Sequence, residues 1–533
     1  MQETQEKIKE WKGKSKIKKI MKHNLKSHQE KGITLIALVV TIIIILILAG
    51  ITINMLLGEN GIIRTAQEAK NTWENAITNE QEELNNLMNE LNEELRDKSK
   101  DIYVFLYDDG TLAFSNKNEL IEGKALVKEY GNIVGQEYTT GWKNGELIST
   151  TPWFEDKNNI LKVSFLDEIK PTSTAGWFTS CKQITQMDGM DNLNTRYVTN
   201  MYRMFAYCEN LQNLDVSNLN TRNVTNMAEI FMNCTNLISL DVSKFNTNKV
   251  TTMSLMFGNC YNLTNLDVSN FNTSQVTDMY SMFYECQKLT NIDVSNFNTN
   301  KVTNMGQMFS GCNALTSLNL SNFDTSQVTE MSSMFHYNKS LENLDLSSFD
   351  TSKVINMSYM FSYCERLETL KLSNNFDTQN VTTMREMFSG CYALKSLDLS
   401  SFTTSKVTDM YCMFTYCRNL ENLDVSQFNT SNVEDMYSMF YECQKLTNID
   451  VSSWDTSKVT NMEQMFGICF EITSLDLSSF DTSKVMNMKG MFRYSNKLTV
   501  IYVGPKWVIN EETSIEQMFD GCGTTSVTVK TTT

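Results

Sequence analysis

A short repeat runs through most of the chain. The dipeptide Met-Phe, once replaced by Ile-Phe, recurs from Met204 to Met518 with a period of about 26 residues, which lies in the range of solenoid repeats. The stretch DMYSMFYECQKLTNIDVS occurs twice, beginning at Asp278 and at Asp435, 157 residues apart, which is six repeats plus one inserted residue. In a solenoid each unit buries its apolar face only against its neighbours.

Each unit follows the pattern V-T-x-M-x-x-M-F-x-x-C-x-x-L-x-x-L-D-[VL]-S-x-F-[ND]-T and contains two apolar spacings. The first half has apolar residues on one helical face, as at Val276, Met279 and Met282. The second half alternates like a strand, as at Ile292 and Val294. The sequence therefore predicts an α/β repeat solenoid over residues 175–522, with one short strand and one short helix in each of about 13 coils.

The full pattern resembles the BspA-like leucine-rich repeat of bacterial surface proteins. The L-x-x-L-x-[VL] strand is the part shared with leucine-rich repeats in general, and about a dozen copies match at several positions each. The resemblance implies a surface-exposed solenoid, with adhesion in some members of the family. It brings no catalytic residues and no cofactor.

Cysteine and methionine fall in fixed columns of the repeat. Most of the 32 Met occupy two columns, which favours a hydrophobic core over a metal site. Twelve of the 13 Cys occupy one column, where Asn338 and Ser495 replace it in two units, and Cys412 is the odd one. No C-x-x-C pair is present, which argues against zinc. We expect small buried thiols, while disulfides between adjacent coils remain an alternative.

The N-terminal segment has the composition of a membrane anchor. Residues 1–31 contain ten Lys and four Glu, and the stretch from Ile33 to Leu57 carries no charge. Such a span is long enough to cross a bilayer. The preceding lysines place the N-terminus in the cytoplasm and the remaining chain outside. We therefore expect a basic leader over 1–32, a transmembrane helix over 33–57 and an extracellular repeat region at the cell surface.

The junction K-G-I-T-L-I at residues 31–36 resembles a type IV prepilin-like signal. In that family a peptidase cuts after the Gly, which here lies between Gly32 and Ile33. The resemblance implies a pilin-like or pseudopilin subunit of a filament or secretion apparatus as an alternative function. Ala37 stands where pilins carry the Glu that serves subunit assembly, which favours a tether over a filament.

Three further segments surround the solenoid. Residues 58–100 repeat apolar side chains at helical spacing and predict an amphipathic stalk helix. Residues 101–174 contain two hairpin signals, at Asp109-Gly110 and Asn144-Gly145, and predict a small β-rich domain that covers the first coil. Residues 523–533 are expected to form a closing strand and a tail.

The negative charge of the chain concentrates in the strands. The first 31 residues carry +6 within a total of −16, so the remainder carries −22, which argues against nucleic acid as a partner. In each L-D-[VL]-S strand the Asp points outward. This candidate binding face consists of Asp215, Asp241, Asp267, Asp293, Asp345, Asp398, Asp424, Asp450 and Asp476, and Asn319, Lys371 and Tyr502 interrupt it.

Three interpretations of this column stay open. The carboxylates can be solvated and hydrogen-bonded to nearby Ser or backbone groups, they can hold cations such as Ca²⁺ between coils, or they can face a basic partner. No nucleophile motif or phosphate loop is present, and the chain has only three His. The sequence therefore favours a non-enzymatic, membrane-tethered surface protein that binds a protein or glycan ligand.

Overall fold

The computed structural model describes residues 101–530. The leader, the expected transmembrane helix, the stalk and the processing residues Gly32 and Ile33 lie outside the described residues. Within residues 101–530, no helix has the length and apolarity needed to cross a membrane. Sixteen strands and three short 3-10 helices make up the regular structure of this part of the chain.

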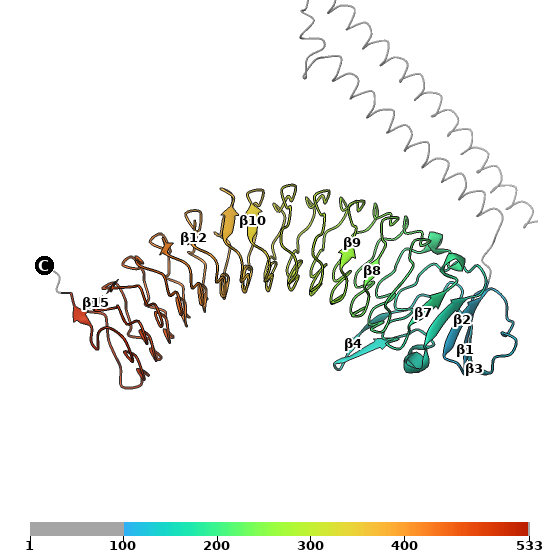
Figure 1. The fold of residues 1–533 in the computed structure, drawn as a ribbon, viewed down its shortest axis with the longest axis horizontal. Helices are drawn as coiled ribbons and strands as arrows, with labels where there is room; N and C mark the ends of the chain where they lie inside the picture. The colour runs from blue at the N-terminus through green and yellow to red at the C-terminus, as the bar shows by residue number, and fades with distance from the viewer. Residues whose placement is uncertain (1–100, 531–533) are drawn as a thin grey trace, which may run out of the picture. The chain divides into compact units, whose positions relative to one another are not determined.

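A five-stranded sheet in the order β3-β1-β2-β6-β7 begins the described part of the chain, and its last strand, β7, already belongs to the first coil (Figure 1). The β1–β2 and β1–β3 pairs are antiparallel, and the β2–β6 and β6–β7 pairs are parallel. A separate hairpin joins β4 to β5. The bounds are β1 Tyr103–Tyr107, β2 Thr111–Ser115, β3 Leu126–Asn132, β4 Thr140–Lys143, β5 Glu146–Ser149, η1 Phe154–Asn159, β6 Lys162–Phe165, β7 Gln186–Asp188, η2 Met190–Asn192 and η3 Thr195–Tyr197.

A β-solenoid of about 14 turns, each of about 26 residues, follows (Figure 1). Its short strands pair in parallel with the strand one coil further along, so that Leu344 lies opposite Leu370. The strands are β8 Ser239–Leu240, β9 Asn265–Leu266, β10 Asn343–Leu346, β11 Thr369–Leu372, β12 Ser396–Leu397, β13 Asn422–Leu423, β14 Ser474–Leu477 and β15 Val500–Val503, and β16 Thr528–Val529 pairs with β15.

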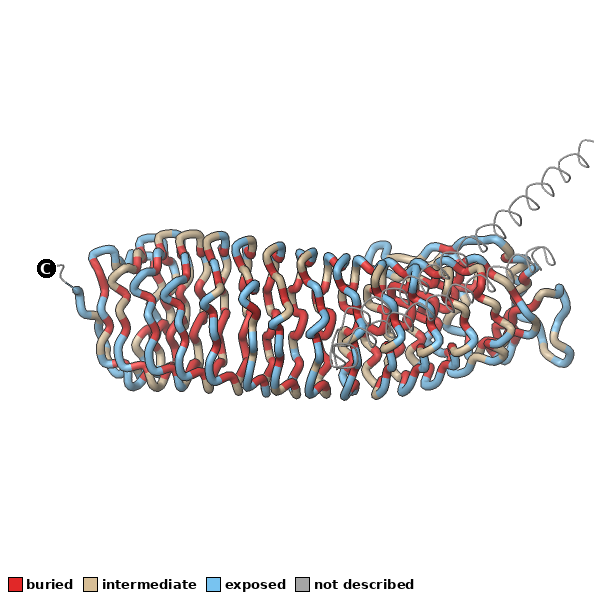
Figure 2. Tube along the Cα trace, turned by 90° about the horizontal axis from the view of Figure 1, so that it is seen from above, coloured by how far each residue is buried: buried red, intermediate tan, exposed pale blue. Residues whose placement is uncertain are grey.

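One hydrophobic core runs from the N-terminal sheet into the last coils. Phe114 of β2 stacks on Trp177 at a ring-centroid distance of 5.1 Å, so the sheet covers the first coil with aromatic side chains. Figure 2 shows buried positions recurring at the same place in successive coils. The apolar columns of the repeat, Met included, are buried as predicted.

The recurrent Phe of each coil forms a continuous stack inside the solenoid. From Phe205 to Phe519, rings of neighbouring coils lie 5.4–6.2 Å apart between centroids. Their planes are nearly parallel, as between Phe205 and Phe231 at 1°. A ring that stacks on both sides buries both of its faces, so each coil stabilises the coils before and after it.

The first half of each coil is a chain of turns, and the predicted short helix is wrong. In the coil around Met282, alternate N–H groups donate to the next coil, from Ser281 to the carbonyl of Gly306 and from Phe283 to that of Met308, both at 2.9 Å. The N–H groups between them donate three residues back, as from Met282 to the carbonyl of Met279 at 3.2 Å. The backbone of this segment therefore bonds mainly between coils.

Two residues in most coils adopt a left-handed backbone, which a right-handed helix cannot contain. In the same coil these are Ser281, with φ of 53°, and Glu285, with φ of 56°. Each left-handed residue interrupts the right-handed winding of the backbone, so one turn ends there and a new turn begins. The apolar side chains consequently point inward every third residue without a helix.

The cysteine column consists of buried thiols except for Cys522, which is half-buried, and none of the 13 cysteines is in a disulfide. A typical thiol, Cys286, donates from Sγ to the carbonyl oxygen of Phe257 in the preceding coil at 3.3 Å. Where the column changes residue, Ser495 donates to the equivalent carbonyl of Phe466 at 2.7 Å. The column thus favours a small side chain with a hydrogen-bond donor, which gives this buried carbonyl a second bond beside the one from the N–H three residues further on, as from Cys260 to Phe257 at 3.2 Å.

The Thr column joins coils as well. Thr273 Oγ1 donates to the carbonyl of Asn298 at 2.9 Å and accepts from the N–H of the same residue at 2.8 Å. The preceding Asn272 accepts from the N–H of Ser274 at 3.0 Å, which closes a local turn. Each Asx-Thr pair therefore combines a turn within one coil and a contact with the next.

Candidate binding face on the strands

The nine predicted Asp residues lie on the outer side of the segment in which each coil pairs with its neighbours, and two of them, Asp345 and Asp476, fall inside strands. In β10, Asp345 is exposed between Leu344 and Leu346, which are 2% and 0% exposed. Leu240 pairs with Leu266 in the neighbouring coil, and this register places Asp241 next to Asp267. All nine are exposed except Asp476, which is half-buried. The structure therefore brings the predicted residues onto one face.

Each carboxylate closes a small turn with the Ser two residues further on. Asp241 Oδ1 accepts from the N–H of Ser243 at 3.0 Å and from its hydroxyl at 2.6 Å. These bonds from Ser243 hold the pKa of Asp241 below its usual range. In Asp345 the bonds from Ser347 and then Lys371 lower the pKa to about 2. The hydrogen-bonded arrangement, the first of the three interpretations, is present in the structure.

The Ser bonds of these turns all end on Oδ1, and two lysines contact the second oxygen, Oδ2. Lys371 Nζ lies 3.0 Å from Asp345 Oδ2, and Lys530 Nζ lies 2.7 Å from Asp476 Oδ2. Within residues 101–530, no ammonium or guanidinium group forms an ion pair with the other seven carboxylates of the column. These seven therefore offer an acceptor oxygen to a molecule outside the chain.

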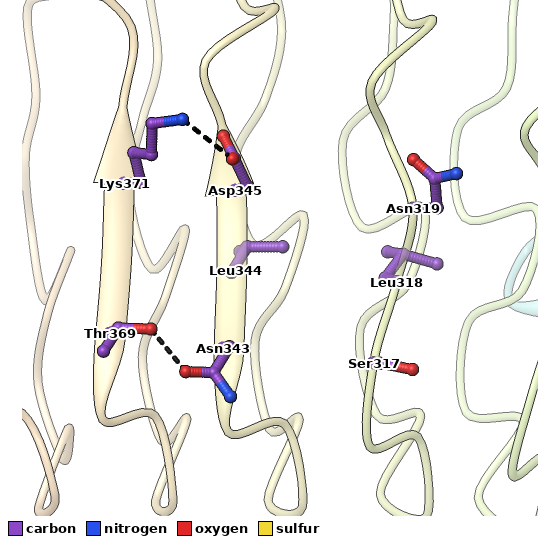
Figure 3. A pocket seen from close by; sticks show the side chains of 8 residues that line it. All are labelled: Ser317, Leu318, Asn319, Asn343, Leu344, Asp345, Thr369 and Lys371. Carbon is purple, nitrogen blue, oxygen red and sulfur yellow. Dashed lines mark hydrogen bonds and ion pairs between the residues drawn. The ribbon is translucent and has the colours of Figure 1, made fainter.

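A groove of about 430 Å³ crosses three coils where the column changes residue (Figure 3). Asn319 occupies the Asp position here and keeps the same turn, accepting from the N–H of Ser321 at 3.1 Å. Thr369 donates from its hydroxyl to Asn343 Oδ1 across the groove. The lining residues are Ser317, Leu318, Asn319, Asn343, Leu344, Asp345, Thr369 and Lys371.

Sequence reasoning missed part of this groove. Asn319 and Lys371 were visible as interruptions of the Asp column, but Ser317, Asn343 and Thr369 were not singled out. These three stand two residues before the column position, and side chains two apart on a strand point to the same face. That spacing is the signal that could have found them.

Groups suited to metal binding or catalysis are sparse in the part of the chain that the structure describes. There, no cluster of three or more His, Cys, Asp or Glu side chains could hold a metal ion. The single His of this part, His336, is half-buried, and its Nδ1 lies 3.1 Å from the carbonyl oxygen of Ser362. Burial lowers the pKa of His336 to about 4, so its ring is neutral at physiological pH.

Stacked coils joined in parallel through short strands and single bridges define a β-solenoid repeat protein. The chain belongs to the family described as "Mycoplasma protein of unknown function, DUF285", which matches residues 172–292, 286–374, 341–448, 365–471 and 421–531. Among solved structures it is similar to a leucine-rich repeat protein from Eubacterium ventriosum ATCC 27560, with 14% identity and a TM-score of 0.34, over 80% of this chain and 94% of that one. No curated protein matches the chain.

Proposed function

We propose that this protein is a membrane-anchored bacterial surface protein whose strand face binds a basic macromolecular partner, as an adhesin does. The repeat pattern resembles BspA-like surface proteins, and the uncharged segment 33–57 after a lysine-rich leader supports a tether with the solenoid outside the cell. The proposed role is binding without catalysis.

One observation carries the choice of a basic partner. Two carboxylates of the column already hold lysine side chains of the chain itself, through the outward Oδ2 atoms of Asp345 and Asp476. Bonds from Ser295 and Ser426 lower the pKa of Asp293 and Asp424, and exposed carboxylates such as these are ionised at neutral pH. A lysine- or arginine-rich polypeptide lying along the column would make equivalent contacts coil after coil.

The test compares two sets of three charge deletions in the full-length chain. Asp398→Asn, Asp424→Asn and Asp450→Asn together remove charge from the column, and Asn319 shows that Asn keeps the turn. The control set is Asp324→Asn, Asp350→Asn and Asp377→Asn, at a position where other coils carry Asn, as at Asn272 and Asn298. Both sets change the net charge equally.

The probe is fluorescein-labelled octalysine, measured by anisotropy at about 0.1 M salt, where exposed charges still interact over about 10 Å, with octaglutamate as the negative probe. We expect the column set to raise the Kd at least about tenfold and the control set to raise it by less than about threefold. Binding should weaken as salt is added, because exposed charges are screened. Absence of octalysine binding, or equal losses from both sets, would refute the proposed role of the column.

The proposed topology has its own test. Intact cells treated with a protease should lose the repeat region, detected with an antibody against residues 175–522, while a cytoplasmic marker stays intact. Protection of the repeats in intact cells, with digestion after lysis, would rule out a surface location.

A further inference from the structure

Five tyrosines form a continuous ridge across five successive coils, on a different segment of the coil from the Asp column. We call the side chains of Tyr337, Tyr363, Tyr392, Tyr416 and Tyr441 the tyrosine ridge. Ring centroids of neighbours along it lie 4.9, 6.5, 6.5 and 5.7 Å apart. After the first, stacked pair, the rings meet at 86°, 69° and 77°, so faces and edges alternate along the ridge.

The fold does not require tyrosine at these positions. Tyr363 and Tyr416 occupy the second position after the core Phe, where other coils carry Asn233 and Asn259. All four residues have left-handed backbone, with φ between 56° and 63°, a conformation that Asn adopts more readily than Tyr. Tyr337 is 37% exposed and the other four ridge residues are half-buried. The aromatic rings therefore add surface without completing the core.

The ridge offers hydrogen-bond donors and little net charge. Among residues 101–530, no hydrogen bond engages the hydroxyl of any of the five tyrosines. The flanking charges pair with one another, Lys339 with Glu365 at 3.1 Å and Arg418 with Glu442 at 2.9 Å. The two cations also lie over ridge rings, Lys339 at 5.5 Å from the ring centroid of Tyr337 and Arg418 at 4.9 and 5.5 Å from those of Tyr392 and Tyr416. The surface is thus suited to an uncharged ligand that is rich in hydrogen-bond acceptors and has apolar rings.

We propose that the tyrosine ridge binds a proline-rich polypeptide in the polyproline II conformation. Such a helix has free carbonyl groups and no internal hydrogen bonds, and aromatic-lined surfaces are its common receptors. It rises about 3.1 Å per residue with three residues per turn, so one face recurs every ~9.3 Å. Two stacked strands repeat every ~9.6 Å. Proline rings on one face therefore recur at nearly the interval of two coils and can contact the ridge at every second coil.

This inference goes beyond the proposed function and does not depend on it, because the ridge and the Asp column carry different residues and suit ligands of different charge. The probe is nonaproline, titrated calorimetrically into the full-length chain. Control ligands are a Gly-Ser peptide of the same length, which lacks the rings, and chitohexaose and cellohexaose, which test a glycan on the same tyrosines.

The decisive variant combines Tyr363→Asn with Tyr416→Asn. The matched control is Tyr494→Asn, which occupies the same position of a later coil, is 45% exposed and lies outside the ridge. We expect the double variant to raise the Kd for nonaproline at least about tenfold, as loss of central aromatic contacts does, and Tyr494→Asn to leave it within about twofold. Both variants should keep the melting temperature and the octalysine affinity of the parent chain.

Three outcomes would overturn the inference. The first is absence of nonaproline binding at millimolar peptide. The second is an equal loss of affinity in Tyr494→Asn, which would place the peptide elsewhere. The third is binding of a hexasaccharide, abolished by the double variant, without binding of nonaproline, which would make the ridge a carbohydrate surface.

Discussion

The side-chain amide of Asn338 donates to the carbonyl oxygen of Phe309 at 3.0 Å, the same bond that a thiol makes in the neighbouring coils. Cys364 in the following coil donates to Phe335 at 3.1 Å. Asn, Ser and Cys share this column because each can donate to a buried carbonyl that has no access to water. What the side chains of this column share is a hydrogen-bond donor, and the thiol of Cys is one of the three groups that provide it.

Substitutions at Cys364 should separate hydrogen bonding from packing. Cys364→Ser keeps a donor, and we expect it to change the unfolding free energy by less than about 1 kcal/mol. Cys364→Val keeps the volume but removes one of the two hydrogen bonds that the Phe335 carbonyl accepts, the other coming from the N–H of Asn338 at 3.3 Å. We expect it to lower the unfolding free energy by about 1 kcal/mol more than the serine variant does. Urea unfolding followed by circular dichroism measures both. A valine variant as stable as the serine variant would contradict this account.

Native thiols should resist alkylation, with one exception. Burial raises the pKa of Cys234 and Cys312 to about 12, so almost no reactive thiolate exists at pH 8. Cys522 is only half-buried, and we expect it to react first with N-ethylmaleimide. Mass spectrometry should find one label on the native chain and, after unfolding in urea, a label on all 13 Cys. Fast labelling of several buried positions in the native chain would show that the coils open.

His336 should make the protein less stable in mild acid. The unfolded side chain takes up a proton below about pH 6.5, whereas burial lowers the pKa of the folded one to about 4. Stability is therefore fully present above pH 6.5 and falls as the pH drops to about 4, by at most about 3 kcal/mol.

The matched variant for this effect is His336→Ser, because Ser310 and Ser362 occupy the same position in adjacent coils. The difference in urea midpoint between pH 7 and pH 4.5 should be smaller in His336→Ser than in the parent chain. Identical pH profiles would mean that His336 is solvated in the folded protein.

Leu255 offers a direct test of turns against a helix. Its φ is 52°, a costly conformation for leucine, and Gly490 occupies the same position in a later coil. Leu255→Gly should therefore leave stability unchanged or raise it by up to about 1 kcal/mol. In a helix the same change would lower stability by about 1 kcal/mol. A clear loss in thermal unfolding would favour the helix.

The period, the buried columns and the outward Asp row could be predicted because they depend only on spacing. Met279 and Met282 recur at a fixed interval, and Asp293 alternates with buried Ile292 and Val294. Stacking then follows from the need of each unit to bury its apolar face.

The helix could not be excluded in the same way. Apolar residues at i, i+3 and i+6 suit both a short helix and a series of turns, and Ser281 and Glu285 are not residues that usually signal a left-handed backbone. The bonds that decide between them, such as Ser281 to Gly306, join different coils and are invisible until the coils are stacked. The groove depends on the same inter-coil register, which brings Asn343 beside Thr369.

The identical stretches beginning at Asp278 and Asp435 occupy equivalent places in coils six turns apart. Every coil offers the coil before it the same set of acceptor carbonyls, as Gly306 does to the N–H of Ser281 and Glu463 does to the N–H of Ser438. Homologous recombination between the two copies in the gene would add or delete whole coils. The coils that become neighbours at the new junction would still form the same backbone hydrogen bonds with one another. The number of coils in the solenoid can therefore increase or decrease in a single genetic event, while the residues of the core columns stay the same.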